Sequence, residues 1–95
     1  MAFISAVKKR EVKTIESLLK QIGNINVKDR KKNTALIYAS QNGDKEIVQL
    51  LLNHNADVNT LDKYGNTALI VASASGYESI VHALLERGAN VNEMN

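Results

Sequence analysis

The stretch DRKKNTALI, residues 29–37, returns as DKYGNTALI at residues 62–70, so the two copies lie 33 residues apart. The same register holds as far as Asn59, which pairs with Asn92. One register kept through a whole period indicates an internal repeat. Repeats of this length are typical of arrays in which small helical units stack on one another.

A weaker copy lies one period earlier. Its matching positions are apolar apart from one asparagine: Ile4, Ala6, Ile15, Leu18, Leu19, Ile25 and Asn26. We therefore divide the chain, residues 1–95, as a single domain. It contains a partial N-terminal capping repeat at 1–28 and two repeats at 29–61 and 62–95.

Each period predicts two short helices. Thr34 begins the first helix because its hydroxyl can accept from amides of the first turn. Gly43 ends it because glycine adopts the left-handed conformation at little cost. The second helix carries apolar residues at helical spacing, such as Ile47 and Leu51. No unit alone can bury its apolar stripe, so we expect an all-α solenoid of stacked helix-turn-helix repeats joined by extended turns.

The composition narrows the class of protein. Hydrophobic residues make up 44% of the chain, proline and cysteine are absent, and aromatic residues reach only 4%. Without cysteine there are no disulfides and no thiolate metal sites. The N-terminus does not read as a signal peptide, and no run approaches the roughly 20 apolar residues of a membrane span. We expect a cytoplasmic, intracellular protein with no cofactor and no membrane partner.

This pattern resembles the ankyrin repeat, whose Thr-Pro-Leu-His-x-Ala motif is matched here by Thr34, Leu36 and Ala39. The motif proline is replaced by alanine in both repeats. Isoleucine replaces the motif histidine in both repeats, as Ile37 in the first of them. In the family this histidine makes hydrogen bonds, so here apolar contact has to substitute for them. Lys32 stands where the family prefers a turn glycine.

The resemblance implies a protein partner, bound by the tips of the turns and the exposed face of each first helix. It also implies a scaffold without catalytic activity. Carried over position by position, it selects for the turns Lys28, Arg30, Lys31, Asn33, Leu61, Lys63, Tyr64 and Asn66. For the first helices it selects Lys8, Lys9, Tyr38, Gln41, Asn42, Val71, Ala74 and Ser75.

Basic residues crowd this predicted surface. Seven of the 12 lysines and arginines belong to it or adjoin it: Lys8, Lys9, Lys28, Arg30, Lys31, Lys32 and Lys63. One interpretation is a concave face that favours an acidic protein segment. The other is that the lysines only keep exposed turns soluble. For Tyr64 the alternatives are an anchor for the partner or packing over its own turn.

Other functions find less support. His54 and His82 lie on different second helices without ligand partners at suitable spacing, so we do not expect an enzyme. Nucleic-acid binding by the basic face lacks interleaved aromatic residues. A third alternative is a purely structural stacking fragment of a longer ankyrin-repeat protein. The apolar second helix of the last repeat motivates it, and also leaves open whether the chain is monomeric or self-associates through an uncapped C-terminal repeat.

Overall fold

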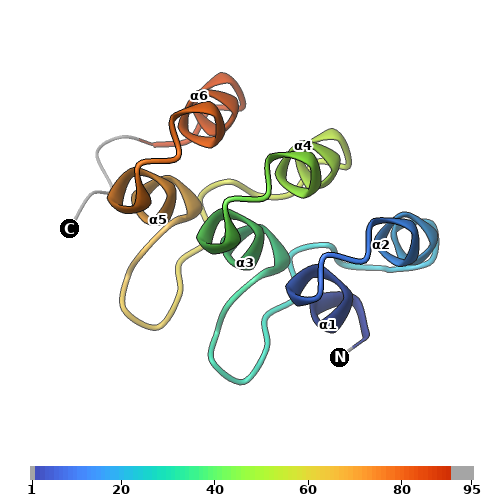
Figure 1. Cartoon of the computed structure of the whole chain (residues 1–95). Helices are drawn as coiled ribbons and strands as arrows, with labels where there is room; N and C mark the ends of the chain where they lie inside the picture. Colours follow the sequence, from blue (N-terminus) through green and yellow to red (C-terminus); the bar gives the residue numbers. More distant parts are fainter. Residues whose placement is uncertain (1, 91–95) are drawn as a thin grey trace.

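The computed structural model describes residues 2–90, and these residues form six helices joined by loops, with no strand. Figure 1 shows three helical hairpins side by side, with the first helix of each in one layer and the second helix in the other. The predicted all-α solenoid is confirmed. The helices are α1 Ala2–Lys8, α2 Val12–Leu19, α3 Ala35–Asn42, α4 Lys45–Asn53, α5 Ala68–Ser75 and α6 Glu78–Glu86.

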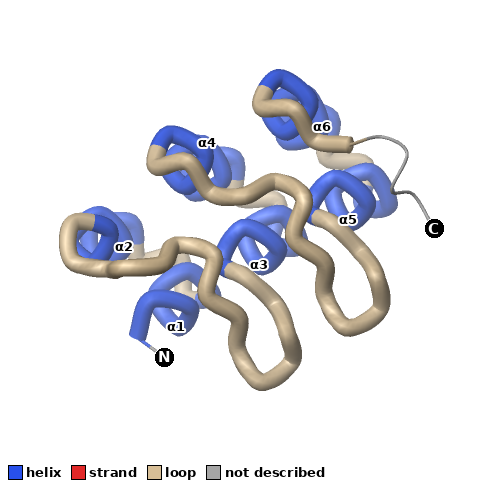
Figure 2. The backbone as a smooth tube through the Cα atoms, turned by 180° about the vertical axis from the view of Figure 1, so that it is seen from behind, coloured by secondary structure: helices blue, strands red, loops and turns tan. Residues whose placement is uncertain are grey.

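Two long turns leave this stack on the side of the first helices. Figure 2 shows them as two parallel loops, one leading into α3 and the other into α5. Helices α1, α3 and α5 pack on one another in sequence, and each also packs on the second helix of its own hairpin. The turns therefore stand next to each other along one edge of the molecule, in front of the layer that α1, α3 and α5 form.

The helix boundaries follow from the side chains that the repeat keeps. The Thr34 hydroxyl oxygen accepts from the Ile37 amide at 3.2 Å, and Thr67 makes the same bond in the next repeat. Gly43 ends α3 with a φ of 70°. Three residues other than glycine also have a positive φ, and each aligns with a glycine of another repeat: Arg10, Lys32 and Asn55. The repeat thus imposes its backbone even where the sequence departs from glycine.

The core runs through all three hairpins as one cluster of buried apolar residues. Ile37, at the position of the motif histidine, is fully buried there. Apolar contact therefore fills this position, as expected from the replacement of the histidine.

Asparagine side chains link neighbouring repeats by hydrogen bonds. The Asn26 side-chain oxygen accepts from the Asp57 amide at 2.7 Å, and the Asn59 oxygen accepts from the Asn90 amide at 2.9 Å. These two bonds are one repeat apart and join equivalent positions. They give two loop amides an acceptor in the neighbouring repeat.

Arginines tie the ends of helices in one repeat to the next repeat. Arg87 donates to the Leu52 carbonyl at 2.7 Å and to the Asn53 side-chain oxygen at 2.9 Å, at the C-terminus of α4. Arg10 donates to the Asn42 carbonyl at 3.0 Å, at the C-terminus of α3. The last carbonyls of a helix lack partners inside the helix, so each guanidinium satisfies one and also places a positive charge at the negative end of the helix.

The last hairpin leaves apolar groups exposed on the side away from α4. Leu85 is 39% exposed, whereas Leu52, its equivalent in the central repeat, is 1% exposed. Val81 is half-buried, whereas its equivalent Val48 is fully buried. The last part of the C-terminal repeat, residues 91–95, lies outside the described residues, so the expectation of an uncapped repeat stays a prediction.

Candidate protein-binding surface

An aspartate organises each of the two turns. The Asp29 side chain accepts from the amides of Lys31, at 2.9 Å, and Asn33, at 3.0 Å. Asp62 makes the same pair of bonds one repeat later, at 2.8 and 2.9 Å. Each carboxylate thus closes its own turn, and the side chains at the tip are left facing outwards.

The first turn has an additional support that the second lacks. The Tyr38 hydroxyl donates to the Asp29 carboxylate, and the Lys8 ammonium lies 5.0 Å from the centre of the Tyr38 ring. Tyr38 is only 8% exposed. Selected above as a partner contact, this side chain instead lies inside the protein and holds the turn in place.

These contacts shift the pKa values of both groups. Burial acts to raise the pKa of Asp29, but hydrogen bonds from Tyr38 and from the amides of Asn33 and Lys31, together with the Lys8 charge, outweigh it and lower the pKa. Burial and the bond to Asp29 raise the pKa of Tyr38. The Asp29 carboxylate therefore stays charged and is already occupied by donors of its own repeat.

A hollow between the two turns, which we call the central groove, has a volume of about 340 Å³. Seven of the residues selected from the sequence line it: Lys31, Asn33, Gln41, Lys63, Tyr64, Asn66 and Val71. Tyr64 is 71% exposed, so its ring does not pack into its own turn. The Lys63 ammonium lies 5.1 Å from the centre of that ring. The groove thus combines aromatic and aliphatic surface with two cations.

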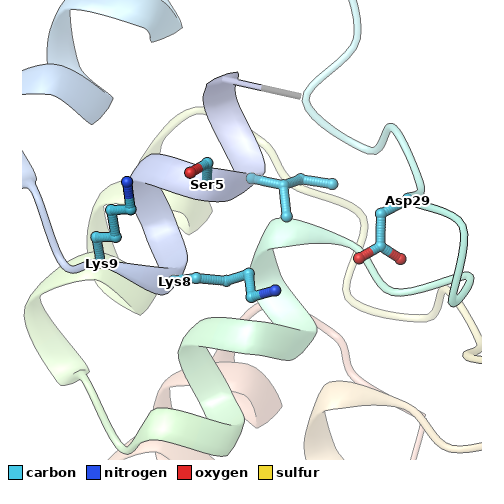
Figure 3. A pocket seen from close by; sticks show the side chains of 5 residues that line it. Ser5, Lys8, Lys9 and Asp29 are labelled. Carbon is cyan, nitrogen blue, oxygen red and sulfur yellow. The ribbon is translucent and has the colours of Figure 1, made fainter.

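A second hollow, which we call the N-terminal pocket, lies one repeat earlier and has a volume of about 300 Å³. Ile4, Ser5, Lys8, Lys9 and Asp29 line it. Figure 3 shows both lysines leaving the end of α1, with Lys8 extending toward the side of Asp29 and Lys9 turning the other way. Of these five residues, the two lysines were predicted from the sequence, whereas Ile4, Ser5 and Asp29 were not.

The alignment of the repeats holds the signal that could have found Ser5. This small residue stands where the next repeat has Tyr38 and the last has Val71. A tyrosine fills the space in front of its helix, and a serine leaves that space open. The pocket therefore follows from a difference between the repeats, and positions that the repeats share do not indicate it.

The remaining selected residues lie around these two hollows. Lys28 and Arg30, together with Asp29 and Lys31, line a third hollow of about 730 Å³ at the first turn. The Lys28 ammonium donates to the Leu61 carbonyl at 2.7 Å, so it also braces the second turn. The others line neither hollow: Leu61 is 39% exposed, Asn42 is half-buried, and Ala74 and Ser75 are exposed on α5.

The described residues offer little that would support other chemistry. Both histidines are exposed. Within residues 2–90, no group of three or more histidine, aspartate or glutamate side chains is placed to hold a metal ion. No helix in this range is long and apolar enough to cross a membrane. A further hollow of about 470 Å³ lies on the last hairpin and is lined by Ser73, Gly76, Glu78, Val81 and His82.

Comparison with known sequences agrees with this architecture. The family model described as ankyrin repeats (3 copies) matches residues 3–95, nearly the whole chain. A search of curated proteins finds no match.

Proposed function

Because this chain belongs to the ankyrin-repeat family, we propose that it is a non-catalytic scaffold that binds a partner protein along its turns and first helices. Ankyrin repeats are generally protein–protein interaction modules and typically have no catalytic activity. In this proposal residues 1–28 cap the stack, and the repeats at 29–61 and 62–95 supply the two turns. The partner presents an acidic segment to the basic face that these turns and the first helices form.

The central groove is the observation that carries the proposal. It brings together seven residues that the resemblance selects one by one, from two turns and two helices. Tyr64 supports an anchoring role because exposed tyrosines bury a large area at small entropic cost when a partner binds. Lys31 and Lys63, both exposed, stand beside it.

The distribution of charge supports an acidic partner. All seven basic residues of this face are exposed. The two acids among them, Asp29 and Asp62, are engaged by amides of their own turns. Since complementary charge raises association rates and selects between partners, a segment rich in glutamate or aspartate suits this surface.

The test reverses charge on the groove and, separately, on the opposite side of the molecule. The groove variant is Lys31→Glu with Lys63→Glu. The control is Lys13→Glu with Lys20→Glu, two exposed lysines of the second-helix layer that give the same change in net charge. The probe is a fluorescent peptide of alternating glutamate and serine, and the readout is anisotropy. We expect the groove variant to lose about tenfold or more in affinity, and the control to change by less than about threefold.

Two outcomes would contradict the proposal. An equal loss in both variants would mean that only net charge matters. Tighter binding of a single-stranded oligonucleotide than of the acidic peptide at physiological salt, with the steep salt dependence of phosphate contacts, would assign the surface to nucleic acid instead.

A further inference from the structure

The two hollows share two positions that are equivalent one repeat apart, Lys8 with Gln41 and Asp29 with Asp62, but the rest of their lining differs. Position 8 is lysine, whereas its equivalent Gln41 is neutral. The N-terminal pocket is lined by lysines and a serine, and the central groove adds Tyr64 and Val71. A partner that offered only negative charge would not distinguish the two hollows. The difference between them therefore indicates which kind of side chain the partner places in each.

The N-terminal pocket suits a carboxylate. Lys8 is held over the Tyr38 ring, which limits the freedom that a lysine side chain loses on binding. Lys9 and the Ser5 hydroxyl add a charge and a hydrogen-bond donor at the same hollow. Asp29 is held by donors from its own repeat, and Lys8 lies near enough to lower its pKa. The two lysines outnumber this one acid, so the pocket favours an anion.

The central groove suits an apolar side chain. The Tyr64 ring is largely exposed, and Val71 of α5 lines the groove with it, beside side chains that are polar or charged: Lys31, Asn33, Gln41, Asp62, Lys63 and Asn66. Gln41 stands at the position where the N-terminal repeat has a lysine, so the central groove has two ammonium groups instead of three. An apolar side chain that binds there therefore does not have to remove water from a third charged group. Lys63 stacks against the tyrosine, and its stem adds apolar surface.

The repeat fixes the distance between these two preferences. Packed helices lie about 8–10 Å apart, and the two hollows are offset by one helix of the first layer. A polyproline II segment rises about 3.1 Å per residue with three residues per turn, so side chains three positions apart share a face and lie about 9 Å apart.

We propose that the partner segment is extended and carries an acidic residue and an aromatic or large aliphatic residue three positions apart. The acidic residue occupies the N-terminal pocket and the apolar one the central groove. This inference rests on the proposed function and specifies the partner for the same surface.

The experiment uses short capped peptides with two prolines between a glutamate and a tryptophan, made in both orders. Comparison peptides replace the glutamate by glutamine, replace the tryptophan by alanine, or place the two residues next to each other. We expect one order to bind about fivefold tighter than every comparison peptide. The order that binds gives the direction of the chain in the groove.

Two variants assign each residue to its hollow. Lys8→Gln, which installs the residue found at position 41, should remove the preference for glutamate and leave the preference for tryptophan. Tyr64→Ala should do the reverse. Combining Lys8→Gln with Gln41→Lys moves the cation by one repeat, so the peptide with adjacent residues should then bind best. Unchanged circular dichroism checks that each variant folds.

Equal affinity for all the peptides, or losses in Lys8→Gln that do not depend on the glutamate, would overturn the spacing rule. The charge-reversal result with the acidic peptide would still stand, so failure of this inference can be told apart from failure of the proposed function. Absence of binding by every patterned peptide at millimolar concentration would also overturn it.

Discussion

Replacing Lys32 by glycine should make the protein more stable. Lys32 has a φ of 64°, and its amide donates to the Asp29 carbonyl at 2.9 Å to close the first turn. The equivalent residue of the next repeat is Gly65, with a φ of 80° and the same hydrogen bond at 3.1 Å. The Lys32 side chain is exposed, so the substitution removes backbone strain without removing buried contacts.

The magnitude follows from two opposing effects. A residue with a Cβ in the left-handed region is destabilised by about 1–2 kcal/mol. Glycine also makes the unfolded chain more flexible, which lowers stability by about 0.4–1 kcal/mol. The expected net gain is about 0.5–1 kcal/mol, or about 2–8 °C in the melting temperature of a domain of this size.

Thermal and urea unfolding followed by circular dichroism measure this gain. Lys32→Ala is the control for charge because it removes the ammonium but keeps the Cβ, and its stability should change by less than about 0.5 kcal/mol. Gly65→Ala is the reverse experiment and should lose about 1 kcal/mol or more. A Lys32→Gly protein no more stable than the wild type, or an equal gain in Lys32→Ala, would refute the reasoning.

Three further predictions concern polar side chains. Asp29→Ala should lose about 2 kcal/mol of unfolding free energy, and more than Asp62→Ala, because only the first turn also loses the bond from Tyr38; equal losses would contradict this. The pKa of Asp29 is lowered in the folded state, so the stability that its carboxylate gives the fold is complete above the unfolded pKa of about 3.9 and is lost as the pH falls through the lower folded pKa. The free energy of unfolding should therefore fall less steeply with acidification in Asp29→Ala than in the wild type. Ser40→Ala should gain about 1 kcal/mol because the Ser40 hydroxyl is fully buried and has no hydrogen-bond partner among residues 2–90. Ser73→Ala, at the exposed equivalent position, should show little change.

The fold could be predicted from the sequence because its signals are local and recur. Thr34 and Gly43 mark the ends of α3 through contacts within a few residues, and the 33-residue register carries those marks to α5. Much of the candidate site could also be predicted from the sequence, since the side chains at the tip of a turn point outwards wherever the turn closes on its own aspartate.

Contacts across repeats could not be predicted in this way. Lys28 counts as a partner contact by its place in the turn, yet its ammonium lies next to a carbonyl that is 33 positions away. The hydrogen bonds that Asn26 and Asn59 make to the next repeat could not be predicted either, because an asparagine in a loop has many amides within reach. Only the packed structure selects which one it meets.

The hydrogen bonds that cross from one repeat to the next join residues 31 to 35 positions apart. Each such contact therefore closes a loop of nearly the same length, and the entropy of closure grows only with the logarithm of that length. Folding can begin at either pair of neighbouring hairpins and spread to the third without bringing the two ends of the chain together. The time needed for each step is then set by one repeat, whatever the length of the array.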